Sequence, residues 1–163
     1  MKNVLLIFSV FVILSACSTG DEPGTAERSS TYLLYRANYN PVSGDVTVRE
    51  LAPGQLQFHI KLQNTTEGGE HPAHLHFGSV REVGELAFAL NPVDGSTGES
   101  VTVLDGVQMS DGEVLTYDSF LEMDASIKVH MNDNYFKHMV LSFGNVGKNE
   151  NYFFDGVAMC TGH

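Results

Sequence analysis

The stretch Leu56-Gln57-Phe58-His59-Ile60-Lys61-Leu62 alternates strictly between apolar and polar side chains. A period of two is typical of an antiparallel strand that buries one face, so its four apolar residues are expected in a core. Val46-Thr47-Val48 before it and the segment from Ile127 to Met131 after it alternate in the same way. Pro53-Gly54 separates the first two segments, which predicts a hairpin.

Other short segments continue this pattern outward along the chain. Strands are expected at residues 32–37, 74–77, 86–90, 100–104, 139–143 and 151–159, and a short helix at 116–121 with Thr116 as its N-cap. No long segment has a helical period. About seven to nine short strands separated by turn residues predict an all-β fold, a Greek-key antiparallel sandwich or barrel.

Composition limits the class of protein. The chain has 163 residues, of which 42% are apolar and 18% charged, with a net charge of −11. These values are typical of a globular chain, and the length fits a single domain, expected over residues 31–163. An acidic surface repels a phosphate backbone, so no nucleic acid is expected as a partner.

The first residues are expected to be an export signal. An apolar run from Val4 to Leu14 follows Lys2 and is too short to cross a bilayer. Leu14-Ser15-Ala16-Cys17 resembles a bacterial lipobox, which implies cleavage after residue 16, lipidation of Cys17 and attachment to a membrane. Residues 17–30 are small and polar and are expected to form a flexible tether. The alternative is an ordinary signal peptide cut near Ala16, which leaves Cys17 as a free thiol.

Three histidines are candidates for binding a metal ion. His74 and His76 are two residues apart in an expected strand and so share one face. His130 lies on the expected outward face of its own strand, together with Lys128, and converges with the pair if the two strands are close. Imidazole is a suitable ligand for copper and zinc. The alternative is that these are surface histidines on solvated strands.

Two weaker sets of ligands remain. His59 lies on the polar face of its strand and is a candidate fourth ligand, although a solvated position fits it better. The tail carries Met159, Cys160 and His163, all soft or borderline ligands. Burial of Cys160 as a small apolar side chain is the alternative for this tail.

The sequence resembles two related families. Residues 69–78, GEHPAHLHFG, look like the copper-site strand of Cu/Zn superoxide dismutases, and Val129-His130 followed by Asn132-Asp133 looks like that family's second copper segment. From Asp45 to Gly147 the chain resembles more closely the chordin-type (CHRD) domain of bacterial secreted proteins. This resemblance implies a dismutase-like sandwich, with His74, His76 and His130 as copper ligands and His71 as a structural residue that braces a loop.

The sequence also departs from the dismutase pattern. No histidine lies between Gly78 and Ser100, so the bridging ligand and the zinc site are missing, and no arginine follows Val146 to guide an anion. Loss of residues 1–16 leaves eight basic against 20 acidic side chains, a net charge of 8 − 20 = −12, which would repel superoxide. No motif for nucleophilic catalysis is present.

Three functions therefore remain open at this stage. The first is a lipid-anchored protein at the outer membrane, the cell surface or the periplasm that captures or stores copper. The second is a metal-free structural or adhesion module at the same place. The third, a copper oxidoreductase with dismutase-like activity, has the least support because of the missing groups.

Overall fold

The computed structural model describes residues 27–149, apart from 38, 83, 135 and 137. Its elements, in chain order, are β1 (Ser29–Arg36), β2 (Ser43–Ala52), β3 (Gln55–Gln63), β4 (Glu70–Phe77), β5 (Leu86–Asp94), β6 (Glu99–Asp105), α1 (Tyr117–Leu121), β7 (Asp124–His130) and β8 (Val140–Gly147). The export signal, Cys17, most of the tether, the strand expected at 151–159, Cys160 and His163 lie outside the described residues.

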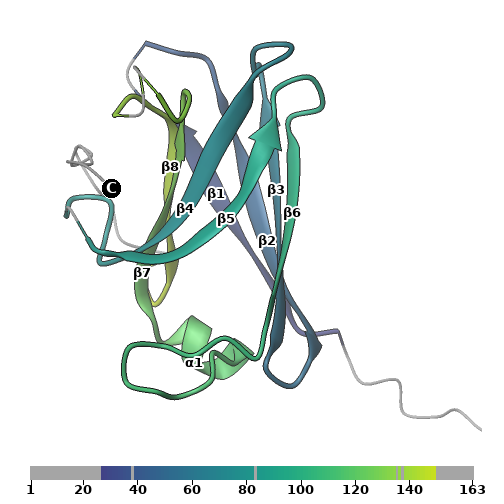
Figure 1. The fold of residues 1–163 in the computed structure, drawn as a ribbon, viewed down its shortest axis with the longest axis vertical. Helices are drawn as coiled ribbons and strands as arrows, with labels where there is room; N and C mark the ends of the chain where they lie inside the picture. The colour runs from purple at the N-terminus through teal and green to yellow at the C-terminus, as the bar shows by residue number, and fades with distance from the viewer. Residues whose placement is uncertain (1–26, 38, 83, 135, 137, 150–163) are drawn as a thin grey trace, which may run out of the picture.

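The eight strands form one antiparallel sheet that curls into a nearly closed barrel (Figure 1). Their order is β5-β4-β7-β8-β1-β2-β3-β6, so the chain crosses over between β3 and β4 and again between β6 and β7. Such crossovers between non-neighbouring antiparallel strands are the feature of a Greek key. The expectation of an all-β Greek-key domain is confirmed.

The core lies inside the barrel and is formed by the apolar residues of the alternating segments, as the pattern predicts. All four apolar residues of the 56–62 stretch are buried, and so are Ile127 and Val129 on β7. The hairpin predicted at Pro53-Gly54 joins β2 to β3, with a bulge between Glu50 and Ala52.

Helix α1 closes one end of the barrel (Figure 1). Thr116 is its N-cap, as expected: the Thr116 hydroxyl accepts from the backbone N–H of Ser119, and the Ser119 hydroxyl accepts from that of Thr116. This reciprocal pair satisfies two donors that a helix start leaves open. Within the described part of the chain, no helix has the length and apolar character needed to cross a bilayer.

Strand β1 begins at Ser29, two residues inside the segment expected to be a tether. Arg28, directly before it, explains the earlier start. Its guanidinium binds Glu50 at 2.9 Å and also Asp118, and it lies 4.7 Å from the ring centre of Tyr117. The hydrogen bond to Asp118 is the main reason that the pKa of Arg28 is raised. These contacts tie the start of β1 to β2 and α1.

Strand β5 also differs from expectation, because it continues through Asn91 and Pro92 to Asp94, beyond the end expected at residue 90. Proline is tolerated here because β5 is at the edge of the sheet and the register with β4 shifts at this point, between His71 and Ala73. Strand β8 likewise continues to Gly147.

Asn91 also joins the two edges of the barrel. No continuous ladder connects β5 with β6. Instead, the side-chain amide of Asn91 donates to the Val101 carbonyl, its backbone N–H donates to the Thr102 hydroxyl, and its carbonyl accepts from Ser100, each at 2.7 Å. Asn91 thus bonds β5 to β6 at this seam through its side chain and both of its backbone groups.

Candidate metal centre

His74, His76 and His130 lie together on the outer face of the half of the barrel formed by β5, β4, β7 and β8. His74 and His76 are two residues apart on β4, and His130 ends the neighbouring strand β7. The ring centres of His74 and His76 are 5.8 Å apart, and those of His74 and His130 are 5.0 Å apart. The i, i+2 spacing and the antiparallel pairing of β4 with β7 therefore bring the three predicted ligands to one place.

The three rings fit a single transition-metal ion. One ring nitrogen from each residue lies within 4.8 Å of the other two. Two nitrogens that bind one ion at about 2.1 Å are at most about 4.2 Å apart, so movements below about 1 Å would bring all three into range. His76 and His130 are buried and His74 is partly exposed, so solvent reaches the group at His74.

This face of the sheet is covered, which corrects one expectation. His130 and Lys128 lie on the outward face of their strand, as expected, but the alternative of surface histidines on a solvated strand does not hold for His130: His130 is 3% exposed and Lys128 0%. The segment that follows β4, residues 78–82 and 84–85, lies over Lys128: its Nζ donates to the Glu82 carbonyl at 3.2 Å, and the Val80 N–H donates to the Asn145 side chain on the neighbouring strand β8 at 2.8 Å. The alternating pattern placed Lys128 and His130 on the correct face of β7, but this outer face is buried as well as the inner one.

The covering segment also orients one of the ligands. His76 Nδ1 lies 3.0 Å from the Gly84 carbonyl oxygen, which can only accept, so Nδ1 carries the proton and Nε2 is left for a metal. A second contact, from the Phe77 N–H to the Glu85 carbonyl at 3.0 Å, holds the segment against β4. Gly84 is required for this approach, because a Cβ there would lie 1.5 Å from the Phe77 carbonyl oxygen. Hydrogen bonds of this kind fix ligand histidines in metal sites.

His71 lies outside the group of three. It is 3% exposed, and its Nδ1 donates to the carbonyl oxygen of Met131 at 2.9 Å. Met131 directly follows the ligand His130, so this bond joins the start of β4 to the end of β7. Such a contact is what a bracing role for His71 requires.

His59 is not brought to the group. It lies on β3, where its Nε2 is 3.4 Å from a carboxylate oxygen of Glu99, and β3 is not a neighbour of β4 or β7 in the sheet. The tail with Cys160 and His163 lies outside the described residues. His138 is exposed on the segment before β8.

The residues that support the site could not be recognised in the sequence. Lys128 was placed on the outward face, yet nothing in its own segment signals that another segment covers it. The presence of two glycines, Gly78 and Gly84, around residues 79–83 was the available signal of a close backbone approach.

Neither a protein-family model nor a curated protein matches this chain. The geometry of the site itself is therefore what indicates a function.

Proposed function

We propose that this chain is a lipid-anchored protein of the bacterial envelope whose barrel captures or stores copper through His74, His76 and His130. The observation that carries the proposal is the convergence of three imidazoles from two strands, with ligand atoms within 4.8 Å of one another. Imidazole suits copper, and among divalent first-row ions copper binds such donors most tightly. The lipobox-like segment at Cys17 supports the membrane anchor and the envelope location.

The arrangement supports binding better than catalysis. The described part of the chain places no carboxylate or thiol in the group of three. The rings of His76 and His130 are buried, and Gly84 lies against the ring of His76, so a substrate would have to approach past His74. A site of this kind is suited to holding an ion.

The test uses the full chain purified in detergent, loaded with copper and desalted. The parent is expected to retain about one equivalent. His74→Ala and His130→Ala are each expected to lose stoichiometric copper, because two imidazoles make a much weaker site. His59→Ala is the matched control, since it removes a strand histidine from the far side of the barrel, and it should retain copper. Retention of copper by His74→Ala and His130→Ala alike would show that the metal binds elsewhere.

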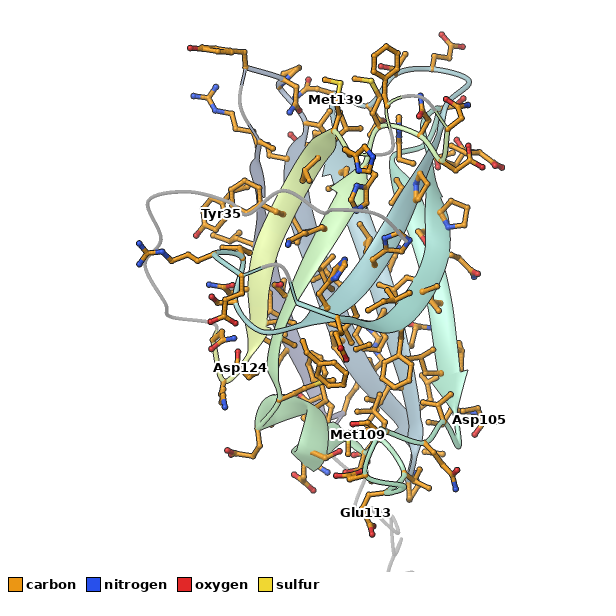
Figure 2. The ribbon with its side chains drawn as sticks, turned by 60° about the vertical axis from the view of Figure 1, so that its left-hand side comes forward. Tyr35, Asp105, Met109, Glu113, Asp124 and Met139 are labelled. Carbon is orange, nitrogen blue, oxygen red and sulfur yellow. The ribbon has the colours of Figure 1, made fainter. Side chains whose placement is uncertain are left out.

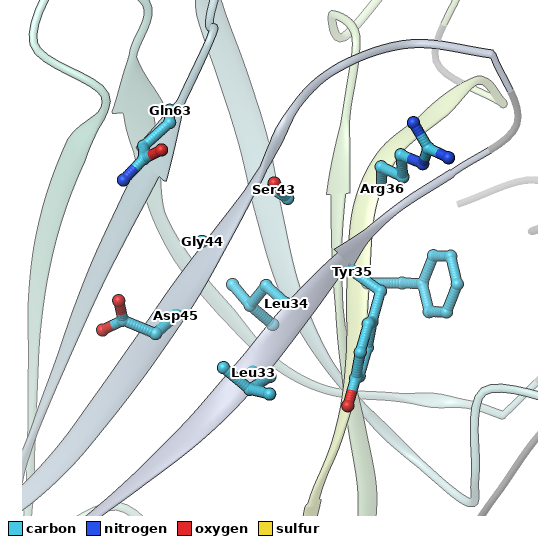
Figure 3. Close-up of a pocket in the computed structure, with 9 residues that line it drawn as sticks. Leu33, Leu34, Tyr35, Arg36, Ser43, Gly44, Asp45 and Gln63 are labelled. Atoms are coloured by element: carbon cyan, nitrogen blue, oxygen red, sulfur yellow. The ribbon is translucent and has the colours of Figure 1, made fainter.

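The second candidate function is a metal-free interaction module. It is favoured by a groove of about 660 Å³ where β1 changes partner from β2 to β8 (Figure 3). Leu33 and Tyr35 at this groove are 60% and 47% exposed. If the parent retains no metal, this function takes the place of the first.

A further inference from the structure

The groove where β1 changes partner exposes apolar side chains. Leu33 and Tyr35 on β1 are 60% and 47% exposed at this groove (Figure 3). The ring centre of Tyr35 lies 6.4 Å from that of Phe143 on β8. Phe143 pairs with Tyr35 on one side and with Lys128 of β7 on the other, so these side chains share the outer face of the sheet. The groove volume of about 660 Å³ is large enough to hold organic groups such as aromatic side chains.

The chain turns back toward this groove at its last described residues. The backbone N–H of Asn149 donates to the Val146 carbonyl at 3.3 Å, which makes residues 146–149 a reverse turn. Gly147, the second residue of this turn, has a φ of +63°. A positive φ at this position is a feature of the turns that join the strands of a hairpin. At Asn149 the chain is therefore directed back along β8, toward Phe143.

The sequence that follows the turn has the composition and the length to fill the groove. The aromatic residues Tyr152, Phe153 and Phe154 come shortly after Asn149. Phe143 is about 10 Å back along β8 from the turn, because a strand rises about 3.4 Å per residue. An extended chain covers about 10–17 Å between residue 149 and residues 152–154. These aromatic residues are therefore within reach of the groove.

Charge favours the same occupant. Arg36 lines the groove on β1 and is exposed. Asp155 directly follows the three aromatic residues in the sequence. A carboxylate next to an exposed guanidinium gains a modest attraction. Asp45, the acidic residue that lines the groove, is on β2, so it lies on a different strand from Arg36.

We propose that residues 150–163 fold back along β8 and dock on this groove, with the aromatic side chains at 152–154 against Leu33, Tyr35 and Phe143. The occupant is then a segment of the same chain, which its connection to β8 keeps at a high effective concentration. An outside protein that used this surface, as the second candidate function requires, would have to displace the segment. The inference is independent of the proposed copper function.

Tryptophan fluorescence tests this docking, because the sequence has no tryptophan of its own. Phe153→Trp and Phe154→Trp are made separately in the full chain in detergent. Acrylamide quenching of each is compared with that of a free peptide of residues 150–163 that carries the same change. Two neighbouring positions are used because successive side chains of an extended segment point to opposite sides. If the segment is docked for about nine tenths of the time, quenching should be about tenfold weaker than in the peptide at the position that faces the groove.

Further changes in the same tryptophan variants locate the docking surface. Leu33→Ser and Tyr35→Ser remove exposed apolar groups from the groove, and together they are expected to strengthen quenching at least about threefold, toward the value of the free peptide. Val103→Ser is the matched control, because Val103 is 46% exposed on β6, which is not a neighbour of β1 or β8 in the sheet. It should leave quenching unchanged. Circular dichroism checks that the variants fold, which is expected for substitutions at exposed positions.

Quenching as strong as in the free peptide at both tryptophan positions would overturn the proposal, and this comparison needs no change in the groove. Protection that survives the combined Leu33→Ser and Tyr35→Ser changes would place the segment on another surface and overturn it as well. An equal loss of protection in Val103→Ser would do the same. None of these results depends on whether the protein retains copper, so failure of this proposal and failure of the copper function are distinguishable.

Discussion

The ring of Phe120 meets the ring of Phe58 edge-on, with ring centres 5.5 Å apart and planes at 90°. Phe58 is in the middle of β3, Phe120 belongs to α1, and both are fully buried. Edge-to-face contacts between aromatic rings stabilise a core beyond the area that they bury. This contact attaches α1 to the interior of the barrel, at the end opposite to Met139 (Figure 2).

Phe58→Ala is expected to lower the free energy of unfolding by about 3–5 kcal/mol, because it opens a cavity and removes the contact with Phe120. Chemical denaturation measures this value. Gln57→Ala, on the opposite face of the same strand, should stay within about 0.5 kcal/mol of the parent. The assignment of faces on β3 would be wrong if the two variants were equally stable, since a slip of one residue exchanges the faces.

Gly84→Ala is expected to push the covering segment away from β4, because the new Cβ would overlap the Phe77 carbonyl. The expected results are a loss of about 1–3 kcal/mol of stability and a fall of roughly 10- to 100-fold in metal affinity, as His76 loses its orienting bond. Stability is measured by denaturation and affinity by chelator competition.

Gly112→Ala is the control for this change. Gly112 has a φ of +87° and nothing within 4 Å of the added Cβ, so alanine there is strained without a clash. It should lose about 1 kcal/mol and keep its metal affinity. If Gly84→Ala behaves in the same way, the covering segment does not orient His76.

His71→Ala is expected to lower stability by about 1–3 kcal/mol while copper is still retained, because it leaves the partly buried Met131 carbonyl without its donor. The thermal midpoint and the retained copper are measured on the same sample. Complete loss of copper at unchanged stability would instead make His71 a ligand.

Copper retention is expected to fall steeply below about pH 6. A histidine must be neutral to bind a metal, and its reference pKa is about 6.5, so protons compete with the ion as the pH decreases. Three ligands make the decrease steeper than one would. Desalting at a series of pH values measures it, and undiminished retention at pH 4.5 would mean that histidines are not the ligands.

Cys17→Ser is expected to move the protein from the membrane fraction to the soluble fraction with an unchanged thermal midpoint. The proposed lipid would be lost, while the barrel, whose first strand begins at Ser29, would be unaffected. Cell fractionation with Cys160→Ser as the control measures this. A Cys17→Ser protein that stays with the membrane would contradict the proposed anchor.

The sequence was most informative where one local rule decides the structure. Alternation in the 56–62 stretch identifies β3 and its buried face because side chains in a strand point to opposite sides. The same rule puts His74 and His76 side by side. The convergence of His130 with them depended on the pairing of β4 with β7, which required the resemblance to a known fold as well as the local pattern.

The parts that could not be predicted depend on contacts between distant segments. Lys128 is buried where Glu82 lies against it, and nothing in the segment from Ile127 to His130 indicates that a segment after β4 reaches this point. The continuation of β5 through Pro92 depends on its position at the sheet edge, which is a property of the whole topology. Alternation reveals the two faces of a strand but not what covers each face.

The seam at Asn91 has a consequence for self-association. The edges of a sheet expose unpaired N–H and C=O groups that can recruit a strand from another molecule and start aggregation. Here three bonds of 2.7 Å occupy the backbone N–H and C=O of Asn91, through the hydroxyls of Thr102 and Ser100, and the carbonyl of Val101, through the Asn91 amide. At this point of the seam, three groups that could pair with a strand of another molecule are therefore already bonded, and resistance to self-association depends in part on an exposed residue outside the core.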